Sequence, residues 1–477
     1  MALQLPYGKA YAQFNVKWIY LSSLVIFEAG SILCAAAPNS KALIAGRVIS
    51  GVGAAALYSG AINMLAMAAS PQRAPALFGI VSSMVGVASL VGPPLGDAFT
   101  DAQSLTWRWC FWINLPIGGV AAIFILVMFR TPGPSPPLEP HTEVQTASHP
   151  RNSAQEIENK PITAPSQLNS QNLPTTALPF REKMRKMDPL GAALLISAMV
   201  SLLIALQWGG TKYSWSDGRV WGCLVCSEVL VAFLLVSLWV NRDDAVIPPR
   251  LLRDRAVLGG VLLISWLSAA LFTHVFFLPF YFQVVRGLSA TASGLRILAY
   301  LGAMALAGVV AGGAMSPRRG LSHHRPYAWV GAGLMHILFV DSGSGMVVGF
   351  QLLSGAALGV AWQVPYVAVQ RSEMRSGDAA IANALIAFSN SFGAALGISV
   401  AQNIFASTLA RGLAALPGLD PGQVNALANA GQAARLRDPD FMAPELLALV
   451  LQVFNDAITS TFTFAAAAGG VASYSRT

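Results

Sequence analysis

The chain of 477 residues is 55% apolar and only 11% charged. A soluble domain carries about 25% charged residues, so this composition excludes an ordinary soluble protein and favours a chain surrounded by lipid. The formal net charge of +8 does not indicate nucleic-acid binding, because the basic residues lie between apolar runs and form no aromatic-interleaved stripe.

Twelve apolar segments predict an all-α integral membrane protein, since about 20 apolar residues span about 30 Å of hydrocarbon. With a cytosolic N-terminus, most lysines and arginines then lie on the cytosolic side, as the positive-inside rule expects. The short segment 327–340 is counted as a span because omitting it would move the basic loop 371–375 outside. The expected spans are 18–36, 42–68, 76–96, 110–129, 190–208, 220–240, 257–284, 293–315, 327–340, 346–369, 380–408 and 447–468.

Residues 130–188 are rich in Pro, Ser, Thr, Asn and Gln and end in a basic cluster at 181–186. Such a segment cannot bury a core, so we expect a disordered cytosolic linker whose basic end lies near anionic headgroups. The linker divides the chain into two membrane bundles. The expected domains are a short remnant of a preceding helix with its cytosolic loop (1–17), an N-terminal bundle (18–129), the linker (130–188), two additional helices (189–241) and a C-terminal bundle (242–477).

Arg47 is the strongest candidate for chemistry, because an ionised group inside hydrocarbon costs at least about 2.5–3.5 kcal/mol. At helical spacing it shares a face with Gly51, Ala54, Ala55 and Tyr58. This face would let a neighbouring helix approach while the guanidinium points into a cavity. There it would change the proton affinity of a carboxylate or bind an anionic group. The alternative is an arginine that only hydrogen-bonds backbone carbonyls across a helix pair.

Glu28 is the expected partner of Arg47 in proton coupling, because it lies in the same predicted bundle. The alternative is a lone polar residue that makes one interhelical hydrogen bond. Neutral polar groups in the second half are candidates to line a substrate cavity, and a tyrosine beside them could face either a lipophilic substrate or lipid. The predicted cavity residues are Gln283, Gln363, Asn390 and Tyr281.

A glycine- and proline-rich segment at 86–96 would break a soluble helix, but in a membrane it predicts a kink beside small packing residues. Its glycines allow close helix packing, so the segment could act as a pivot, as a seal against proton leakage, or only as a packing kink. The residues concerned are Gly86, Gly92, Pro93 and Gly96.

No phosphate-binding loop and no metal-ligand spacing such as H-E-x-x-H occurs in the sequence. We therefore expect neither an ATP-driven pump nor a membrane enzyme, and no cofactor or metal.

Several segments together resemble the major facilitator superfamily, and within it the fungal fourteen-span drug:proton antiporter family. The resemblance rests on the segment around Arg47, on 86–96, on the run 104–118 (SLTWRWCFWINLPIG), and on 277–283 and 401–405. It implies two pseudo-symmetric bundles plus two extra helices at the linker. It also implies that Arg47 couples protons, that 86–96 is the antiporter motif, and that a small lipophilic drug, mycotoxin or other secondary metabolite is exported by alternating access.

The loop motif of this family resembles residues 8–17, with Gly8 at its start and Lys17 at its end. Ala12 stands where the family has an acidic residue. Because this motif normally follows the second helix, the resemblance implies that the first two helices are missing. Alternatives are an importer of a siderophore or a basic amino acid, and a truncated membrane protein that transports nothing. We expect a monomer in the plasma membrane, with the vacuolar membrane as the alternative.

Overall fold

The computed structural model is built of α-helices, and no strand occurs in the part of the chain that it describes. That part covers residues 2–68, scattered positions between 77 and 99, 106–129, 186–210, 212–314, 335–338, 340, 342–371, 374, 378–417 and 444–474. Ten helical segments within it are long and apolar enough to cross a membrane, which confirms ten of the expected spans. The expected spans 76–96 and 327–340, and the linker up to residue 185, fall largely outside the described residues.

The first helices form one packed group, which we call the N-terminal group. Glycines let α2 and α3 approach closely, since a Cβ at Gly30 would lie 2.3 Å from the backbone of Ser50, and one at Gly53 would lie 2.5 Å from the backbone of Phe27. These pairings advance in opposite directions, so the two helices are antiparallel. The group contains α1 (Gln4–Gln13), α2 (Val16–Ala35), α3 (Ser40–Ala68), α5 (Trp109–Trp112) and α6 (Asn114–Met128).

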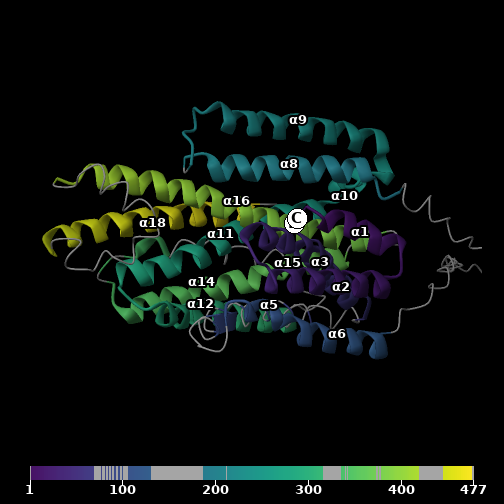
Figure 1. Ribbon diagram of the computed structural model, residues 1–477, viewed down its shortest axis with the longest axis horizontal. Coiled ribbons are helices and arrows are strands. Elements are labelled where there is room, and N and C mark those ends of the chain that lie inside the picture. The colour runs from purple at the N-terminus through teal and green to yellow at the C-terminus, as the bar shows by residue number, and fades with distance from the viewer. Residues whose placement is uncertain are drawn as a thin grey trace, which may run out of the picture.

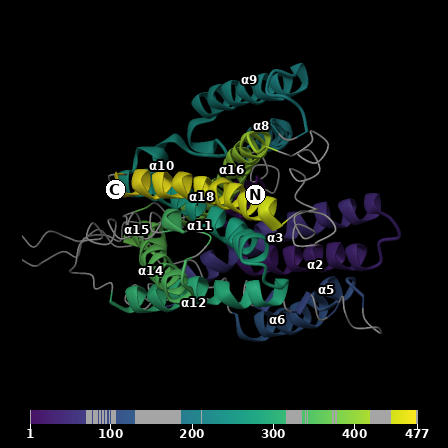
Figure 2. The same ribbon diagram turned by 90° about the vertical axis from the view of Figure 1, so that its left-hand side faces the viewer.

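The two additional helices, α8 (Pro189–Trp208) and α9 (Gly218–Asn241), form a hairpin. Figures 1 and 2 show this hairpin along one side of the molecule, with α8 against α16 and α9 outermost, and with α5 and α6 on the opposite side. Asn403 of α16 fixes one end of α8 by donating a 3.2 Å hydrogen bond to the carbonyl of Leu206. The hairpin is therefore attached along the C-terminal half of the chain.

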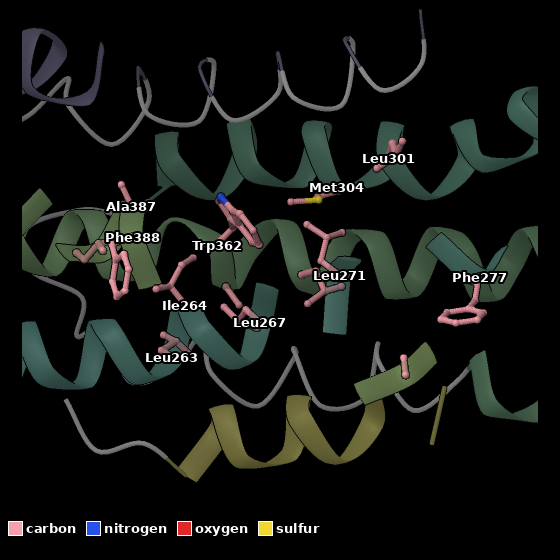
Figure 3. Close-up of a cluster of buried hydrophobic side chains, with 14 of the residues drawn as sticks. Leu263, Ile264, Leu267, Leu271, Phe277, Leu301, Met304, Trp362, Ala387 and Phe388 are labelled. Atoms are coloured by element: carbon pink, nitrogen blue, oxygen red, sulfur yellow. The ribbon is translucent and has the colours of Figure 1, made fainter. Parts of the chain in front are cut away.

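The remaining helices form a second packed group, the C-terminal group, around a continuous apolar core. Figure 3 shows Ile264 and Leu267 of one helix facing Trp362 of another. Within a bilayer such contacts stabilise the group through van der Waals packing, because lipid is as apolar as these side chains. The elements are η1 (Arg242–Asp244), α10 (Pro249–Arg253), α11 (Arg255–Phe280), η2 (Tyr281–Val285), α12 (Ala290–Ala314), η4 (Met335–Ile337), α14 (Ser344–Trp362), α15 (Val364–Arg371), α16 (Asp378–Ala414) and α18 (Pro444–Tyr474).

Close glycine contacts also fix the directions of helices in this group. A Cβ at Gly355 of α14 would lie 2.1 Å from the carbonyl oxygen of Tyr300, and one at Gly359 would lie 2.1 Å from that of Met304. These contacts advance together along α12 and α14, so the two helices are parallel and begin at the same end of the molecule. This is the arrangement that an additional crossing between them, such as the predicted 327–340 span, requires.

The helix α11 also runs parallel to α16, because Gly393 lies against Ser265 and Gly397 against Ala269. The first turns of both helices therefore lie at one end, which also carries α1 and α10. We call this the α1 end of the molecule. It is the end that the positive-inside prediction places in the cytosol.

Candidate functional site

A buried polar network joins the N-terminal and C-terminal groups of helices. The hydroxyls of Tyr58 on α3 and Tyr366 on α15 are 3.2 Å apart. Asn390 of α16 donates to the Tyr58 hydroxyl at 3.0 Å and accepts from Ser268 of α11 at 2.6 Å. Four helices from both halves of the chain thus meet at one neutral hydrogen-bonded cluster, which we call the interface network.

A second polar contact between the groups lies closer to the α1 end. Asn383 of α16 donates to the side-chain oxygen of Asn63 on α3 at 3.1 Å. Both residues are buried, and the Nδ2 of Asn63 and the Oδ1 of Asn383 have no hydrogen-bond partner. An unpaired buried amide group costs about 1–3 kcal/mol, so this pair has a spare donor and a spare acceptor at the interface.

Gln363 lies where α14 ends and α15 begins. Pro365 has no N–H to donate to the carbonyl four residues earlier, and the span 344–369 is interrupted here at a single residue between α14 and α15. The Gln363 side chain is fully buried, with neither its oxygen nor its nitrogen paired. Broken helices with available polar groups are a common feature of binding sites in membrane transport proteins. Gln363 and Asn390 therefore remain good candidates for a cavity.

The other two predicted cavity residues lie elsewhere. Tyr281 and Gln283 both belong to η2, at the end of α11 remote from its first turn. Tyr281 is buried in hydrogen-bonding contact with Ser342 and Arg286, whereas Gln283 is exposed. The structure therefore does not bring these two residues together with Asn390 and Gln363.

Arg47 and Glu28 do not form an ion pair in the described part of the chain. Arg47 is exposed on α3, with its guanidinium carbon 6.0 Å from the centre of the Phe111 ring. Glu28 lies instead between α2 and α6, where its Oε1 would be 1.9 Å from a Cβ at Gly118. Its Oε2 is buried without a hydrogen-bond partner. The guanidinium of Arg47 therefore lies near α5, whereas the unpaired carboxyl oxygen of Glu28 lies against α6.

The predicted small-residue face around Arg47 contacts other helices only over its second half, where Ala55 is buried and Tyr58 bonds to α15 and α16. Gly51 and Ala54 are exposed, and a Cβ at Gly51 would meet nothing within 4 Å. In the glycine–proline segment, Gly86 and Pro93 lie outside the described residues. At Gly92 and Gly96 an added Cβ would meet no described atom within 4 Å. Because most residues of this segment lie outside the described part, its expected close packing stays a prediction.

The loop motif lies at the junction of the two groups. Gly8 packs onto the start of α16, where its Cβ would be 2.2 Å from the Cβ of Ala384. Only a glycine permits this approach of α1 to α16. Lys17 lies within the N-terminal group and donates to the carbonyls of Leu126 at 2.8 Å and Phe129 at 3.0 Å.

Lys9 was not selected from the sequence, yet it is the lysine of this motif that reaches the other half of the chain. It is only 3% exposed, and its Nζ donates to the carbonyl of Lys186 at 2.9 Å and to the carbonyl of Asp244. Burial lowers the pKa of Lys9 from 10.5 to about 8, an effect partly offset by the negative charges of Asp188 and Asp244. The signal for Lys9 was its place beside Gly8, but its acceptors are main-chain groups that no residue pattern reveals.

The run 104–118 also contains residues with a clear structural role. Arg108 donates through Nη1 to the carbonyls of Ala35 and Ala37, both at 2.8 Å, and so satisfies carbonyls at the end of α2. Asn114 donates to the Ser31 hydroxyl at 3.2 Å. These contacts hold α5 and α6 against α2.

An apolar cavity of about 620 Å³ lies beside these short helices, away from the interface network. It contains none of the predicted site residues. Its lining is Phe99, Trp109, Trp112, Ile113, Leu115 and Pro116.

The fold matches solved transporter structures at low sequence identity. The human organic anion transporter MFSD10 (TETRAN) aligns with a TM-score of 0.54 and 13% identity, over 98% of this chain and 80% of that chain. A bacterial homologue of the human lysosomal transporter Spinster, inward-facing and unoccupied, aligns with a TM-score of 0.50 and 14% identity, over 99% and 90%. At these identities the likeness concerns the fold alone.

Residues 1–398 match the family model of the Major Facilitator Superfamily. The chain belongs to the Major Facilitator Superfamily. As a major facilitator with ten described helices able to span a bilayer, it is a multi-pass membrane protein.

Curated relatives of this major facilitator come from fungi. MFS-type transporter phomT of Diaporthe leptostromiformis is 37% identical over 97% of this chain and 71% of the relative. Efflux pump aunC of Aspergillus niger is 37% identical over 97% and 80%. MFS-type efflux pump MFS1 of Trichophyton rubrum is 33% identical over 98% and 79%. Most of the length of each relative is thus represented in this chain.

Proposed function

We propose that this major facilitator exports small lipophilic compounds by alternating access, in exchange for protons. The relatives named efflux pumps support the direction of transport, since aunC and MFS1 align over nearly the whole chain. The cargo class is a drug, a mycotoxin or another secondary metabolite. The plasma membrane is the proposed location, because export from the cell requires it.

The interface network is the observation that carries this proposal. Alternating access needs two bodies that rock about a site, with contacts that form on one side and break on the other. Tyr58, Tyr366 and Asn390 supply such contacts between the two groups of helices. All of these groups are uncharged, and α3, α15 and α16 or their ends also carry the unpaired buried amide groups of Asn63, Gln363 and Asn383. A lipophilic compound with a hydroxyl or a carbonyl would satisfy such groups without bringing a charge into the protein.

Proton coupling is proposed for Arg47 and Glu28. Placing an arginine and a carboxyl group within membrane-spanning helices costs free energy, and such residues usually have a function. Glu28 has a buried oxygen without a partner, and Arg47 has no acidic partner among the described residues. A change in the packing of α2 and α3 would alter the proton affinity of Glu28 through its distance from Arg47.

The proposal is tested with inside-out membrane vesicles from yeast that express the chain. Uptake of a lipophilic fluorescent dye into these vesicles corresponds to export from the cell. We expect uptake to require a gradient that is acidic inside the vesicle. The variant Asn390→Ala should lower uptake about tenfold, the factor that corresponds to about 1.4 kcal/mol for a lost buried hydrogen bond.

The matched control is Gln283→Ala, which removes an exposed amide from the same half of the chain. It should transport like the wild type. Uptake that continues after the gradient is collapsed, or equal loss in both variants, would contradict the proposal. Movement of the dye only in the opposite direction would identify an importer.

A further inference from the structure

We propose that Lys9 is a positioning residue through which the N-terminal group of helices grips the neck of the α8–α9 hairpin and holds the α1 end closed. The hairpin neck consists of residues 186–188 before α8 and residues 242–246 after α9. This assigns a role in gating to two helices that otherwise lie at the edge of the molecule. It rests on the proposed alternating access.

The first step is the geometry of the Lys9 ammonium group. Its two acceptors are the carbonyl of Lys186, directly before the hairpin, and the carbonyl of Asp244, directly after it. One side chain from α1 therefore contacts both ends of a loop that contains the whole hairpin. Because Lys9 is almost fully buried, these are contacts of an interior lysine and not of a solvated surface charge.

The second step is that the neck is itself rigidly closed by Asp188. One carboxylate oxygen of Asp188 accepts from the backbone N–H of Gly191 at 3.0 Å and from the Asn241 side chain at 3.1 Å. The other accepts from the backbone N–H of Val246 at 2.8 Å. Asp188 has a φ of 49°, a left-handed conformation that aspartate tolerates better than most residues. The two sides of the neck thus move as one unit.

The third step is the attachment of the neck to the C-terminal group. Arg250 of α10 binds Asp243 of the neck at 2.9 Å and Asp378, the first residue of α16, at 2.8 Å. The other end of the hairpin is attached to α16 through Asn403. The hairpin and neck therefore belong to the C-terminal group, and Lys9 reaches them from the N-terminal group.

The helix α1 packs on both α16 and α3. In this proposal it moves with α3, where Tyr11 donates to the carbonyl of Ala56, so that opening of the α1 end separates Gly8 from Ala384. Since Lys9 is the next residue of α1, the same movement withdraws its ammonium group from the neck carbonyls. The contact would need to break once in every transport cycle, and its strength would set how often the α1 end opens without cargo.

The test measures opening directly, without transport. A cysteine replaces Ala66, which is half-buried near the end of α3, in a full chain whose native Cys34, Cys110, Cys223 and Cys226 are serine. The purified protein in lipid nanodiscs is treated with a fluorescent maleimide, and the labelling rate is followed. We expect Lys9→Met to raise this rate at least about threefold.

Two controls separate gating from loss of structure. Lys17→Met removes the other lysine of the motif, which also binds two carbonyls but only inside the N-terminal group, and it should leave the rate unchanged. A cysteine at the fully buried Ala465 of α18 reports unfolding of the C-terminal group, and it should stay slow in Lys9→Met.

Equal rates in Lys9→Met and Lys17→Met would overturn the proposal. So would acceleration at both Ala66→Cys and Ala465→Cys, since that result would make Lys9 a general stabilising residue. Because no cargo or proton gradient is used, failure here leaves the efflux proposal standing. If instead Lys9→Met accelerates labelling at Ala66→Cys as expected but the wild type takes up no dye, the efflux proposal fails and the role of Lys9 in closing the α1 end stands.

Discussion

At the scale of single residues, the neutral polar side chains of the C-terminal group were the most informative part of the sequence. Asn390 and Gln363 could be selected because an amide in an apolar run needs a reason to be there. The structure puts Asn390 at the junction of the two groups, where it bonds to Tyr58, and Gln363 between α14 and α15. Tyr58 was noticed only for its position on the face of Arg47. Its partner Tyr366 is 308 residues away, and nothing local indicates that pairing.

Two residue roles could not be predicted because they depend on main-chain atoms. Lys9 and Arg108 both bind carbonyl groups far along the chain. A carbonyl is present at every position, so the sequence gives no sign of which one will accept a bond. The expected joint role of Arg47 and Glu28 in proton coupling stays a prediction, although the two form no ion pair in the described part of the chain. Membership of one bundle does not place two side chains on facing surfaces.

Arg47→Ala should remove the dependence of dye uptake on the proton gradient. Without the guanidinium, no positive charge remains on that part of α3 to shift the proton affinity of a carboxyl group nearby. Uptake into inside-out vesicles should fall to the rate measured without a gradient. Arg411→Ala serves as the control, because it removes an exposed arginine from another spanning helix, α16. Retained gradient dependence in Arg47→Ala would remove this residue from the coupling role.

At the scale of helices, hydrophobic segments predicted the existence of ten spans but not all of their limits. The predicted span 380–408 is part of the longer helix Asp378–Ala414, because its polar last turns add little hydropathy. The predicted span 346–369 is confirmed as Ser344–Val369, with an interruption at Gln363 where Pro365 removes a backbone hydrogen bond. Pro365 indicates some disturbance of the helix from sequence alone. Whether that disturbance is a bend or an interruption depends on how the neighbouring helices pack against it.

Contact between α12 and α14 should be highly sensitive to substitution of Gly355. A methyl group there would lie 2.1 Å from the carbonyl oxygen of Tyr300, and the helices would have to separate at a cost of about 1–3 kcal/mol. We expect Gly355→Ala to lower the thermal midpoint in detergent. Gly349→Ala on the same helix, where a Cβ meets nothing within 4 Å, should keep the midpoint or raise it. Equal midpoints for the two variants would show that this contact is not tight.

The junction at Lys9 should show its own pH dependence. Its pKa is about 8 in the folded protein, below the ordinary 10.5, so the unfolded chain binds more protons between these values. The contribution of Lys9 to stability is therefore greatest above pH 10.5 and falls as the pH drops to about 8. Asp188, Asp244 and Arg250 are the charged groups around it.

The corresponding measurement compares thermal midpoints of the wild type and Lys9→Met from pH 7 to pH 10. The midpoint of the wild type minus that of Lys9→Met should increase as the pH rises above about 8, and should be constant below pH 8. A difference that is constant over the whole range would mean that Lys9 has an ordinary pKa.

At the scale of the whole molecule, membrane class and helical architecture could be predicted from composition and span count. The two-group arrangement of the described helices agrees with the resemblance, although the division at the linker was not deducible from hydropathy alone. What the sequence could not provide is the state of the interface. Whether two bundles touch at one end depends on contacts between residues such as Asn63 and Asn383, which are 320 positions apart.

Fixing these two residues together should stop transport. In a chain without native cysteines, Asn63→Cys and Asn383→Cys would place one thiol on each side of the contact where the amides now meet at 3.1 Å. Because a cysteine side chain is shorter than an asparagine, the thiols are joined with a short bifunctional methanethiosulfonate reagent. The cross-link should hold the two groups of helices together and abolish dye uptake, because rocking requires their separation. Reduction of the same sample should restore uptake, and unchanged transport by the fully cross-linked protein would exclude movement at this interface.

The neutrality of the interface network has an electrical consequence. Moving one elementary charge across a membrane potential of 100 mV changes the electrical free energy by about 2.3 kcal/mol. The hydroxyl and amide groups of Tyr58, Tyr366, Asn390, Asn63 and Asn383 carry no formal charge. Their separation therefore moves no charge through that field. Membrane voltage would act on the proton and on side chains such as Arg47, while the opening and closing of this contact itself would be the same at any potential.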